Sequence, residues 1–306
     1  MNSPSSSVPP RGQRAARARA IAYVTGSAGL FALAAAAVKA LQGALPLSEV
    51  VLFRNLLALP AILLLAQWSA PGGLRGALRT RHPRRHAERL IGGLIGMYGS
   101  FYGYVHLPLA TVTALNFTMP LFLTALSVLL LRERVGWRRL AVVLAGFGGV
   151  LLMLQPGGGG ETLHLGAVAG VLAAALGWAY AMVSIRKMGE LGESGITIVL
   201  WFAIGAAAVA AVATLRVWIT PTPRQWGLLL IVGLVSVGAQ MLMTAAYRSA
   251  DATVIAPFEY SAILWTTVLG VLLWGEVPDM WDLAGFLVLV GAGLAIWRME
   301  VAGAPR

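Results

Sequence analysis

Glu259 is the residue of this sequence whose type and position point most directly to chemistry. It stands beside Tyr260 in an apolar run, about eight residues in and so roughly 12 Å deep at a helical rise of about 1.5 Å per residue. An ionised side chain inside hydrocarbon costs about 2.5–3.5 kcal/mol, so such residues commonly serve function. We expect these two residues to bind a solute or exchange a proton. The alternative is a neutral, hydrogen-bonded carboxyl that only supports helix packing.

Asn116 is the counterpart of Glu259 in an internal repeat. Residues 110–152, which begin ATVTALNFTMPLF, resemble residues 252–296, which begin ATVIAPFEYSAIL, with one residue of insertion. When the two copies are aligned through the acidic residue that follows each first helix, Asn116 falls opposite Glu259 at matching depth. One polar residue from each copy predicts a shared central cavity.

Two basic residues, Lys39 and Arg54, also lie within apolar runs, near the ends of the first two predicted helices. Lys39 is close enough to its helix end to extend its ammonium group to the membrane surface, which is the alternative to a binding role. Arg54 lies deeper, beside Asn55. Either side chain could attract an anionic group, or Arg54 could pair with Glu49.

Small and aromatic residues recur at helical spacing in the third, sixth and eighth apolar segments. Small residues at this spacing predict closely packed helices, and in the third segment they are Gly92, Gly96, Gly99 and Gly103. The side chains that we expect to line a cavity for a flat or amphiphilic solute are Tyr98, Tyr102, His106, Trp178, Gln240 and Tyr247. For any one aromatic side chain, core packing is the alternative.

The sequence contains no constellation of residues for catalysis. There is no cysteine, the four histidines are scattered, and the zinc-protease, nucleophile-elbow and phosphate-loop motifs do not occur. We therefore expect a protein that is not an enzyme and that uses no cofactor and no metal. A membrane-embedded enzyme or a channel ranks below a transporter.

Long apolar helices must position these residues. The chain is 58% apolar and only 11% charged, whereas a soluble domain carries about 25% charged residues. Because a bilayer core requires about 20 apolar residues per helix, we predict an all-α integral membrane protein with ten transmembrane helices. The predicted spans are residues 20–42, 48–68, 89–108, 110–131, 138–155, 164–185, 195–215, 225–247, 252–274 and 281–298.

The basic residues predict an orientation. Of 23 lysines and arginines, all but four fall on the side of the two termini in this ten-helix scheme. The exceptions are Lys39 and Arg54 within helices, and Arg216 and Arg224 on the other side. Since cytoplasmic loops are enriched in Lys and Arg, we expect both termini in the cytoplasm and the protein in the bacterial inner membrane. The net charge of +11 arises from these loops and does not indicate nucleic acid binding.

The repeat divides the chain into two halves of five helices. We expect a disordered basic tail (1–19), a first repeat (20–155), a Gly-rich linker (156–163), a second repeat (164–298) and a cytoplasmic C-terminal tail (299–306). Since five is an odd number, the second repeat must be inverted relative to the first. Inverted repeats are typical of alternating-access carriers, whose substrate sites lie near the bilayer midplane.

The sequence resembles the drug/metabolite transporter superfamily, with two EamA-type repeats. The matching features are Lys39, LPLSEVVLFRN at 45–55, the LLLRE that ends the fourth helix, and APFEYSAILWTTVLGVLLWGEVP at 256–278. The resemblance covers residues 20–298 and implies a secondary transporter of a small metabolite. Members carry amino acids and their derivatives, riboflavin, S-adenosylmethionine or opine-type metallophores.

From this resemblance we expect export of an amino acid or an amino-acid-derived compound, with uptake of riboflavin or S-adenosylmethionine as the alternative. The expected partners are that solute, the lipid bilayer and protons as a candidate coupling ion. The chain is expected to act as a monomer or a homodimer.

Overall fold

The computed structural model describes residues 11–41, 43–131, 137–154, 164–249 and 258–303, and every regular element within them is helical. The elements are α1 (Arg11–Ala40), α2 (Leu47–Ser69), α3 (Gly73–Ala77), α4 (Pro83–His106), α5 (Leu109–Asn116), α6 (Met119–Leu131), α7 (Trp137–Leu154), α8 (Leu165–Glu190), α9 (Gly195–Thr214), α10 (Pro223–Leu230), the π-helical turn η1 (Ile231–Val235), α11 (Ser236–Ser249), α13 (Ser261–Trp274) and α14 (Met280–Gly303).

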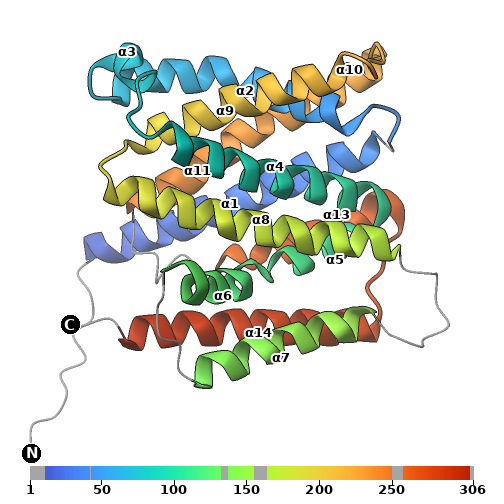
Figure 1. Ribbon diagram of the computed structural model, residues 1–306. Helices are drawn as coiled ribbons and strands as arrows, with labels where there is room; N and C mark the ends of the chain where they lie inside the picture. Colours follow the sequence, from blue (N-terminus) through green and yellow to red (C-terminus); the bar gives the residue numbers. More distant parts are fainter. Residues whose placement is uncertain (1–10, 42, 132–136, 155–163, 250–257, 304–306) are drawn as a thin grey trace, which may run out of the picture.

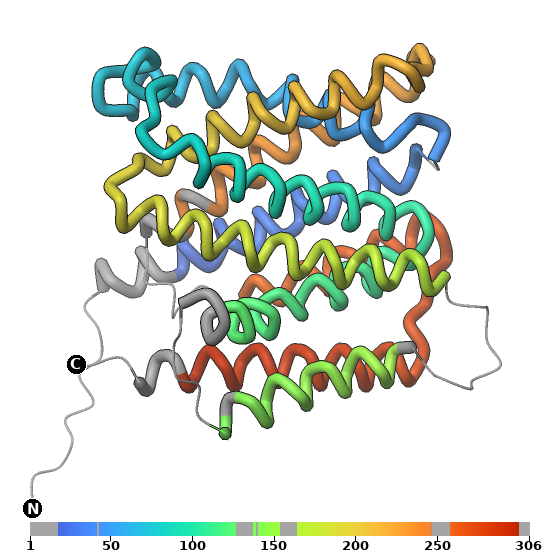
Figure 2. Tube along the Cα trace, viewed as in Figure 1, coloured from blue at the N-terminus to red at the C-terminus, as the bar shows by residue number. Residues whose placement is uncertain are grey.

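Seven helical stretches are long and apolar enough to cross a bilayer, and the protein is an integral membrane protein. They are Ala18–Ala40, Leu47–Ser69, Leu109–Leu126, Leu165–Glu190, Gly195–Thr214, Pro223–Met243 and Met280–Met299. Two shorter apolar stretches, Leu140–Met153 and Ser261–Trp274, lie among them. α4 has 24 residues, but its first turns are rich in charge. The long helices lie side by side in one bundle (Figures 1 and 2).

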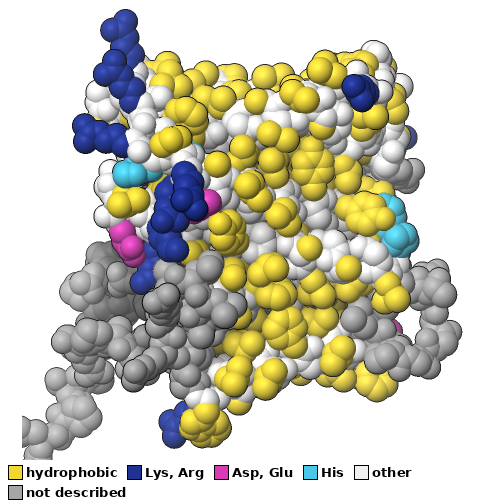
Figure 3. Space-filling model, viewed as in Figure 1, with side chains coloured by type: hydrophobic (Ala, Val, Ile, Leu, Met, Phe, Trp, Pro, Cys, Tyr) yellow, Lys and Arg dark blue, Asp and Glu magenta, His cyan; other side chains and the backbone are white. Residues whose placement is uncertain are grey.

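α1 begins and α14 ends at the same end of the bundle, on the left in Figure 1. We call this end the termini side, and the opposite end, where α1 and α13 finish, the far side. On the face shown in Figure 3, most lysine and arginine side chains gather at the termini side. Hydrophobic side chains cover much of the remaining face, as a surface in contact with lipid requires.

The helices pack in pairs that join distant parts of the chain. α4 packs along α8, and α1 packs along α11. α1 also contacts α13, α8 contacts α6, and α2 packs against α9. α7 and α14 form a further pair at one edge of the bundle (Figure 1). Each pair joins a helix from the first half of the chain with one from the second half.

α4 and α8 approach closely because both carry glycine where they meet. A Cβ on Gly92 would lie 2.8 Å from the Gly177 carbonyl oxygen, and a Cβ on Gly99 would overlap the Gly170 carbonyl oxygen. In lipid, helix association depends on such close packing because hydrocarbon supplies no hydrophobic drive between apolar helices. The predicted close packing of the third and sixth segments is confirmed.

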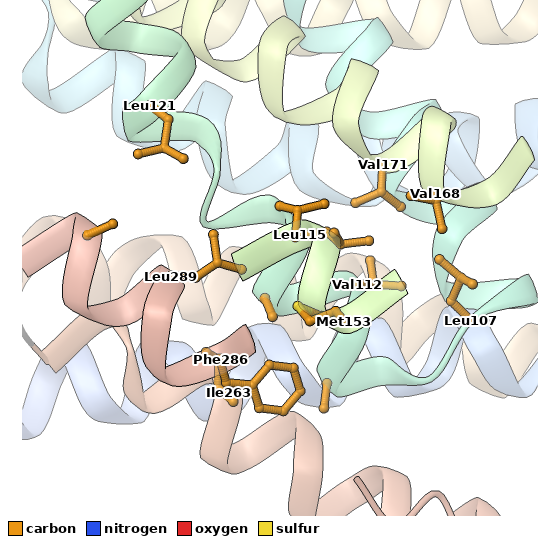
Figure 4. Close-up of a cluster of buried hydrophobic side chains, with 14 of the residues drawn as sticks. Leu107, Val112, Leu115, Leu121, Met153, Val168, Val171, Ile263, Phe286 and Leu289 are labelled. Carbon is orange, nitrogen blue, oxygen red and sulfur yellow. The ribbon is translucent and has the colours of Figure 1, made fainter. Parts of the chain in front are cut away.

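A cluster of buried apolar side chains fills the space between α5, α8, α13 and α14 (Figure 4). Val112, Leu115 and Val171 are among its fully buried members. At this cluster the fourth predicted span is broken into α5 and α6. Pro120 has no N–H to donate to the Asn116 carbonyl oxygen, and the Leu115 carbonyl oxygen accepts from both the N–H and the hydroxyl of Thr118, at 3.0 and 2.6 Å.

Two helices begin earlier than the sequence analysis expected. α1 starts at Arg11, so the segment 11–19, expected to be disordered, is helical. Its many Ala and Arg residues are strong helix formers, which explains the difference. α4 starts at Pro83 rather than near residue 89, because proline suits the first turn of a helix. The linker 156–163 lies outside the described residues.

Candidate functional site

The interrupted segments of the two repeats meet inside the bundle. Phe117, in the turn between α5 and α6, and Tyr260, in the turn before α13, lie with ring centroids 4.6 Å apart. Asn116 and Glu259 directly precede these two rings in the chain, so both polar positions of the repeat lie in one region. The Ser100 hydroxyl donates to Asn116 Oδ1 at 3.3 Å and ties α4 to this region.

Glu259 and Tyr260 face different surroundings. Glu259 is half-buried and takes part in an interaction within the structure. Tyr260 turns its hydroxyl toward α14, where it fills the space that a side chain on Gly293 would need. Tyr260 therefore packs the interface with α14, and Glu259 is the member of the pair that can carry charge.

A buried ion pair joins three segments at the far side. Lys39 Nζ, at the end of α1, lies 2.5 Å from Glu276 Oε1 and donates to the Leu107 carbonyl oxygen at 2.7 Å. Glu276 Oε2 accepts from the Leu109 N–H at 3.0 Å. The side chains of Lys39 and Glu276 are only 11% and 17% exposed. The Lys39 ammonium group is therefore paired inside the bundle. We call Lys39, Glu276 and their two backbone partners the far-side latch.

Two arginines, Arg54 and Arg89, lie near each other beside α4. Arg54 of α2 has its NH1 nitrogen 3.6 Å from Met97 Sδ. Arg89 extends along α4 to Gly93, where a Cβ would overlap its guanidinium, and its Cζ lies 4.2 Å from the Phe202 ring centroid. Gly93 and Met97 are one turn apart on α4, so the two arginines reach neighbouring turns of the same helix. Their charges repel each other.

No carboxylate in the described part of the chain pairs with Arg89. Its Nε and NH1 atoms are buried and have no hydrogen-bond partner. Glu88, the preceding residue, is bound by Arg85 at 2.7 Å. Glu193, in the turn between α8 and α9, is bound by His86 at 3.1 Å. Both carboxylates at this end of α4 are therefore engaged with other residues.

Arg54 is also without an acidic partner among the described residues. Glu49, the partner that the sequence suggested, is fully buried and accepts instead from the Ile219 N–H at 3.3 Å. Asn55 donates to the Val51 carbonyl oxygen one turn back on its own helix. Arg54 therefore keeps its charge free for another anion.

Partly buried aromatic rings lie near this part of α4. Tyr98 of α4, Trp178 of α8 and Phe202 of α9 all pack against the buried cluster that contains Met97. Trp178 fits because Gly96 has no side chain, and a Cβ there would lie 2.5 Å from the indole. These rings can contact the apolar part of a bound solute.

Tyr102 and His106 lie elsewhere, at the far end of α4. Their ring centroids are 4.1 Å apart, and His106 lies 4.9 Å from His164 at the start of α8. A step of four residues turns about 40° around a helix, so a row at this spacing drifts away from Tyr98. The three side chains expected in one row therefore divide between two places.

Gln240 and Tyr247 are placed on α11. Gln240 is exposed beside Ala239, whose carbonyl oxygen accepts from the Ser27 hydroxyl at 2.7 Å where α1 and α11 meet. The side chain of Tyr247 lies outside the described residues. Among the described residues, no group of three or more His, Asp or Glu side chains could hold a metal ion.

Sequence reasoning missed Arg89 and Glu276. Arg89 was counted with a basic loop, although Pro83 signals a helix start that would have placed it inside α4. Glu276 was noted only as the acidic residue after the ninth helix. Its pairing with Lys39 joins residues 237 positions apart, and no local pattern in the sequence announces such a contact.

Comparison with known proteins identifies the class of transporter. A model of the EamA-like transporter family matches residues 18–155 and 165–298. The pseudopaline exporter CntI of Pseudomonas aeruginosa is 32% identical over 275 residues, which cover 88% of this chain and 93% of that protein. The S-adenosylmethionine uptake transporter of Rickettsia bellii is 31% identical over 227 residues, which cover 74% and 76% of the two chains.

Two further comparisons agree in family and fold. The riboflavin transporter of Rhizobium johnstonii is 30% identical over 226 residues, 74% of each chain. One solved crystal structure superposes on 92% of this chain and 99% of its own with a TM-score of 0.59 at 19% identity, which shows a shared fold. The chain belongs to the EamA-like transporter family of the drug/metabolite transporter superfamily, and it is a membrane transporter of a small metabolite.

Proposed function

We propose that this protein exports a small amino-acid-derived solute by alternating access between two inverted repeats of five helices. The observation that carries the proposal is the symmetry of its helix contacts. In chain order, α1, α2, α4, α5–α6 and α7 correspond to α8, α9, α10–α11, the segment that ends in α13, and α14.

When each helix is replaced by its counterpart in the other half, the observed contacts are reproduced. The α4–α8 contact corresponds to the α11–α1 contact, and the α6–α8 contact corresponds to the α13–α1 contact. The α2–α9 and α7–α14 contacts become themselves. A two-fold axis in the membrane plane produces this pattern, as in carriers with inverted repeats. The seven long apolar stretches, α4 and the two shorter stretches then give ten crossings.

Contacts at the two ends of the bundle support alternating access. The far-side latch joins α1, the turn before α5 and the turn after α13, which belong to both repeats. At the termini side, the His86–Glu193 pair joins the start of α4 to the turn between α8 and α9. Rocking of one repeat against the other would open one of these connections while the other stays closed.

Export is favoured by a relative that matches 88% of this chain and is named as a pseudopaline exporter. Uptake of S-adenosylmethionine or riboflavin is the second candidate, because two relatives bear those names. The basic residues gathered at the termini side favour a cytoplasmic location for that side in a bacterial inner membrane.

Transport from a pooled metabolite mixture into sealed inside-out vesicles tests the proposal. Vesicles that contain the protein should accumulate a subset of amino-acid-derived solutes, which mass spectrometry identifies unchanged in the lumen. Vesicles from cells without the protein are the control. Chemical conversion of a solute with no net movement would favour a membrane-embedded enzyme instead.

Reporter fusions test the inverted topology. A reporter after Arg306 should read out the cytoplasm, and a reporter in the 156–163 segment should read out the opposite side, because five crossings separate the N-terminus from that segment. The same side for both reporters would contradict two inverted repeats.

A further inference from the structure

We propose that Arg54 and Arg89 form a receptor for the carboxylate group of the transported solute. This inference rests on the proposed transport function and names the chemical class of its solute: compounds with at least one free carboxylate, and most strongly those with two. The sequence did not place Arg89 at this position, and for Arg54 it allowed either an anionic group or Glu49 as the partner.

The charges of Arg54 and Arg89 are not balanced by acidic residues. The two guanidinium groups are close enough to repel each other, and no salt bridge in the described part of the chain involves either. A buried charge without a partner is strongly unfavourable, and a second like charge nearby adds repulsion. The Nε and NH1 nitrogens of Arg89 are buried without a hydrogen-bond partner, so the unbalanced positive charge lies at this side chain. An anion that enters between the two groups removes both penalties.

The chain holds the guanidinium group of Arg89 in place. Gly93 leaves room for the guanidinium, since a Cβ there would overlap both Arg89 NH1 and the Phe202 ring. The guanidinium lies over Phe202 at 4.2 Å, a contact that fixes its plane. A planar guanidinium held in this way presents parallel N–H donors that match the two oxygens of a carboxylate.

Arg54 and Arg89 reach the apolar part of α4. Met97 is near the middle of the predicted span 89–108, and Gly93 lies one turn nearer the termini side. Substrate sites of carriers with inverted repeats lie near the bilayer midplane. The far-side latch lies toward one end of the bundle and the His86–Glu193 pair toward the other. A solute bound to the arginines would therefore lie between the two connections.

A matched pair of probes tests the charge requirement on the wild-type protein. N-(1-carboxyethyl)phenylalanine carries two carboxylates and a ring that can pack on Tyr98 or Trp178, and its diamide has the same shape without negative charge. Binding to purified protein in detergent is measured by calorimetry. We expect a dissociation constant for the diacid about tenfold to a hundredfold below that of the diamide, the range typical of charge-assisted hydrogen bonds. Equal affinities, or no measurable binding of either probe, would overturn the proposal.

Single substitutions assign the effect to the two arginines. Arg54→Gln and Arg89→Gln should each weaken diacid binding about tenfold or more and leave diamide binding unchanged, because one charge-assisted pair is lost. Arg84→Gln is the matched control, since Arg84 is on the same helix with a side chain 93% exposed. Unchanged diacid binding in both site variants would overturn the proposal. If a variant does not fold, the comparison of the two probes on the wild type still decides.

Vesicle transport separates this inference from the proposed function. Wild-type vesicles that move only solutes without a carboxylate would overturn the receptor while the transport function stands. If the protein binds the diacid and not the diamide, but its vesicles move no solute, the receptor is supported and the transport function is contradicted.

Discussion

Replacement of Lys39 by methionine should open the far side of the bundle more often. Methionine keeps the length of the side chain and removes its charge. Glu276 would then remain between α13 and α14, where its Oε2 still accepts from the Leu109 N–H. An uncompensated carboxylate in a largely buried position destabilises the arrangement that buries it, so states in which Glu276 reaches water gain population.

The size of the effect follows from the burial of the pair. Loss of one member of a fully buried ion pair costs about 3–5 kcal/mol. Because Lys39 and Glu276 keep 11% and 17% exposure at the end of the bundle, water screens part of this cost, and we expect about 2–3 kcal/mol. At about 1.4 kcal/mol per factor of ten, the ratio of open to closed far side should rise about thirtyfold to a hundredfold.

Cysteine labelling measures this change directly, because the natural chain has no cysteine. Ala36 is 3% exposed and packs with Leu109 beneath the latch. An Ala36→Cys side chain should react with a membrane-impermeant maleimide faster when Lys39→Met is also present. Ala44→Cys, exposed at the same end, is the control and should label equally in both backgrounds. Equal labelling of the two Ala36→Cys proteins would refute the role of the latch.

The remaining predictions concern packing and coupling. Gly99→Leu should push α4 away from Gly170 and destabilise the protein by about 1–3 kcal/mol, which lowers its melting temperature. Gly148→Ala is the control, because nothing lies within 4 Å of a Cβ at that position, and it should leave the melting temperature unchanged. Equal melting temperatures for the two variants would contradict close packing of α4 on α8. Glu259→Gln should retain solute binding and lose pH-dependent accumulation in vesicles, because glutamine keeps the size and cannot exchange a proton. Accumulation that follows the wild type across the pH range would remove Glu259 from coupling.

Features with a local period were predictable from the sequence. Apolar runs of membrane length recur as helices, and the glycines of α4 and α8 lie where the two backbones meet. Both follow from the solvent: hydrocarbon demands internal hydrogen bonds, and helices in it associate through close contact. The contact between Phe117 and Tyr260 also follows from the repeat, because these residues directly follow the aligned positions Asn116 and Glu259.

Features that depend on pairing between distant segments were not predictable. Lys39 and Glu276 are ordinary residues at helix ends until α1 and α13 lie side by side. The direction of Arg89 depends on where α4 begins, and a shift of that boundary moves the residue from a loop into the bundle. The drift of Tyr102 away from Tyr98 depends on small rotations that accumulate along the helix.

The symmetry of the frame and the asymmetry of its charges together restrict how a solute can move. Arg54 and Arg89 both belong to the first half, on α2 and α4, whereas α9, the counterpart of α2, has no charged residue between Gly195 and Thr214. At Arg89, α9 supplies the Phe202 ring instead. In the proposed alternating-access cycle, a bound carboxylate would therefore stay with α2 and α4, and access would change as the second half moves around it. Glu259 lies in that second half, so a proton on its carboxyl could bias this movement without competing for the arginines.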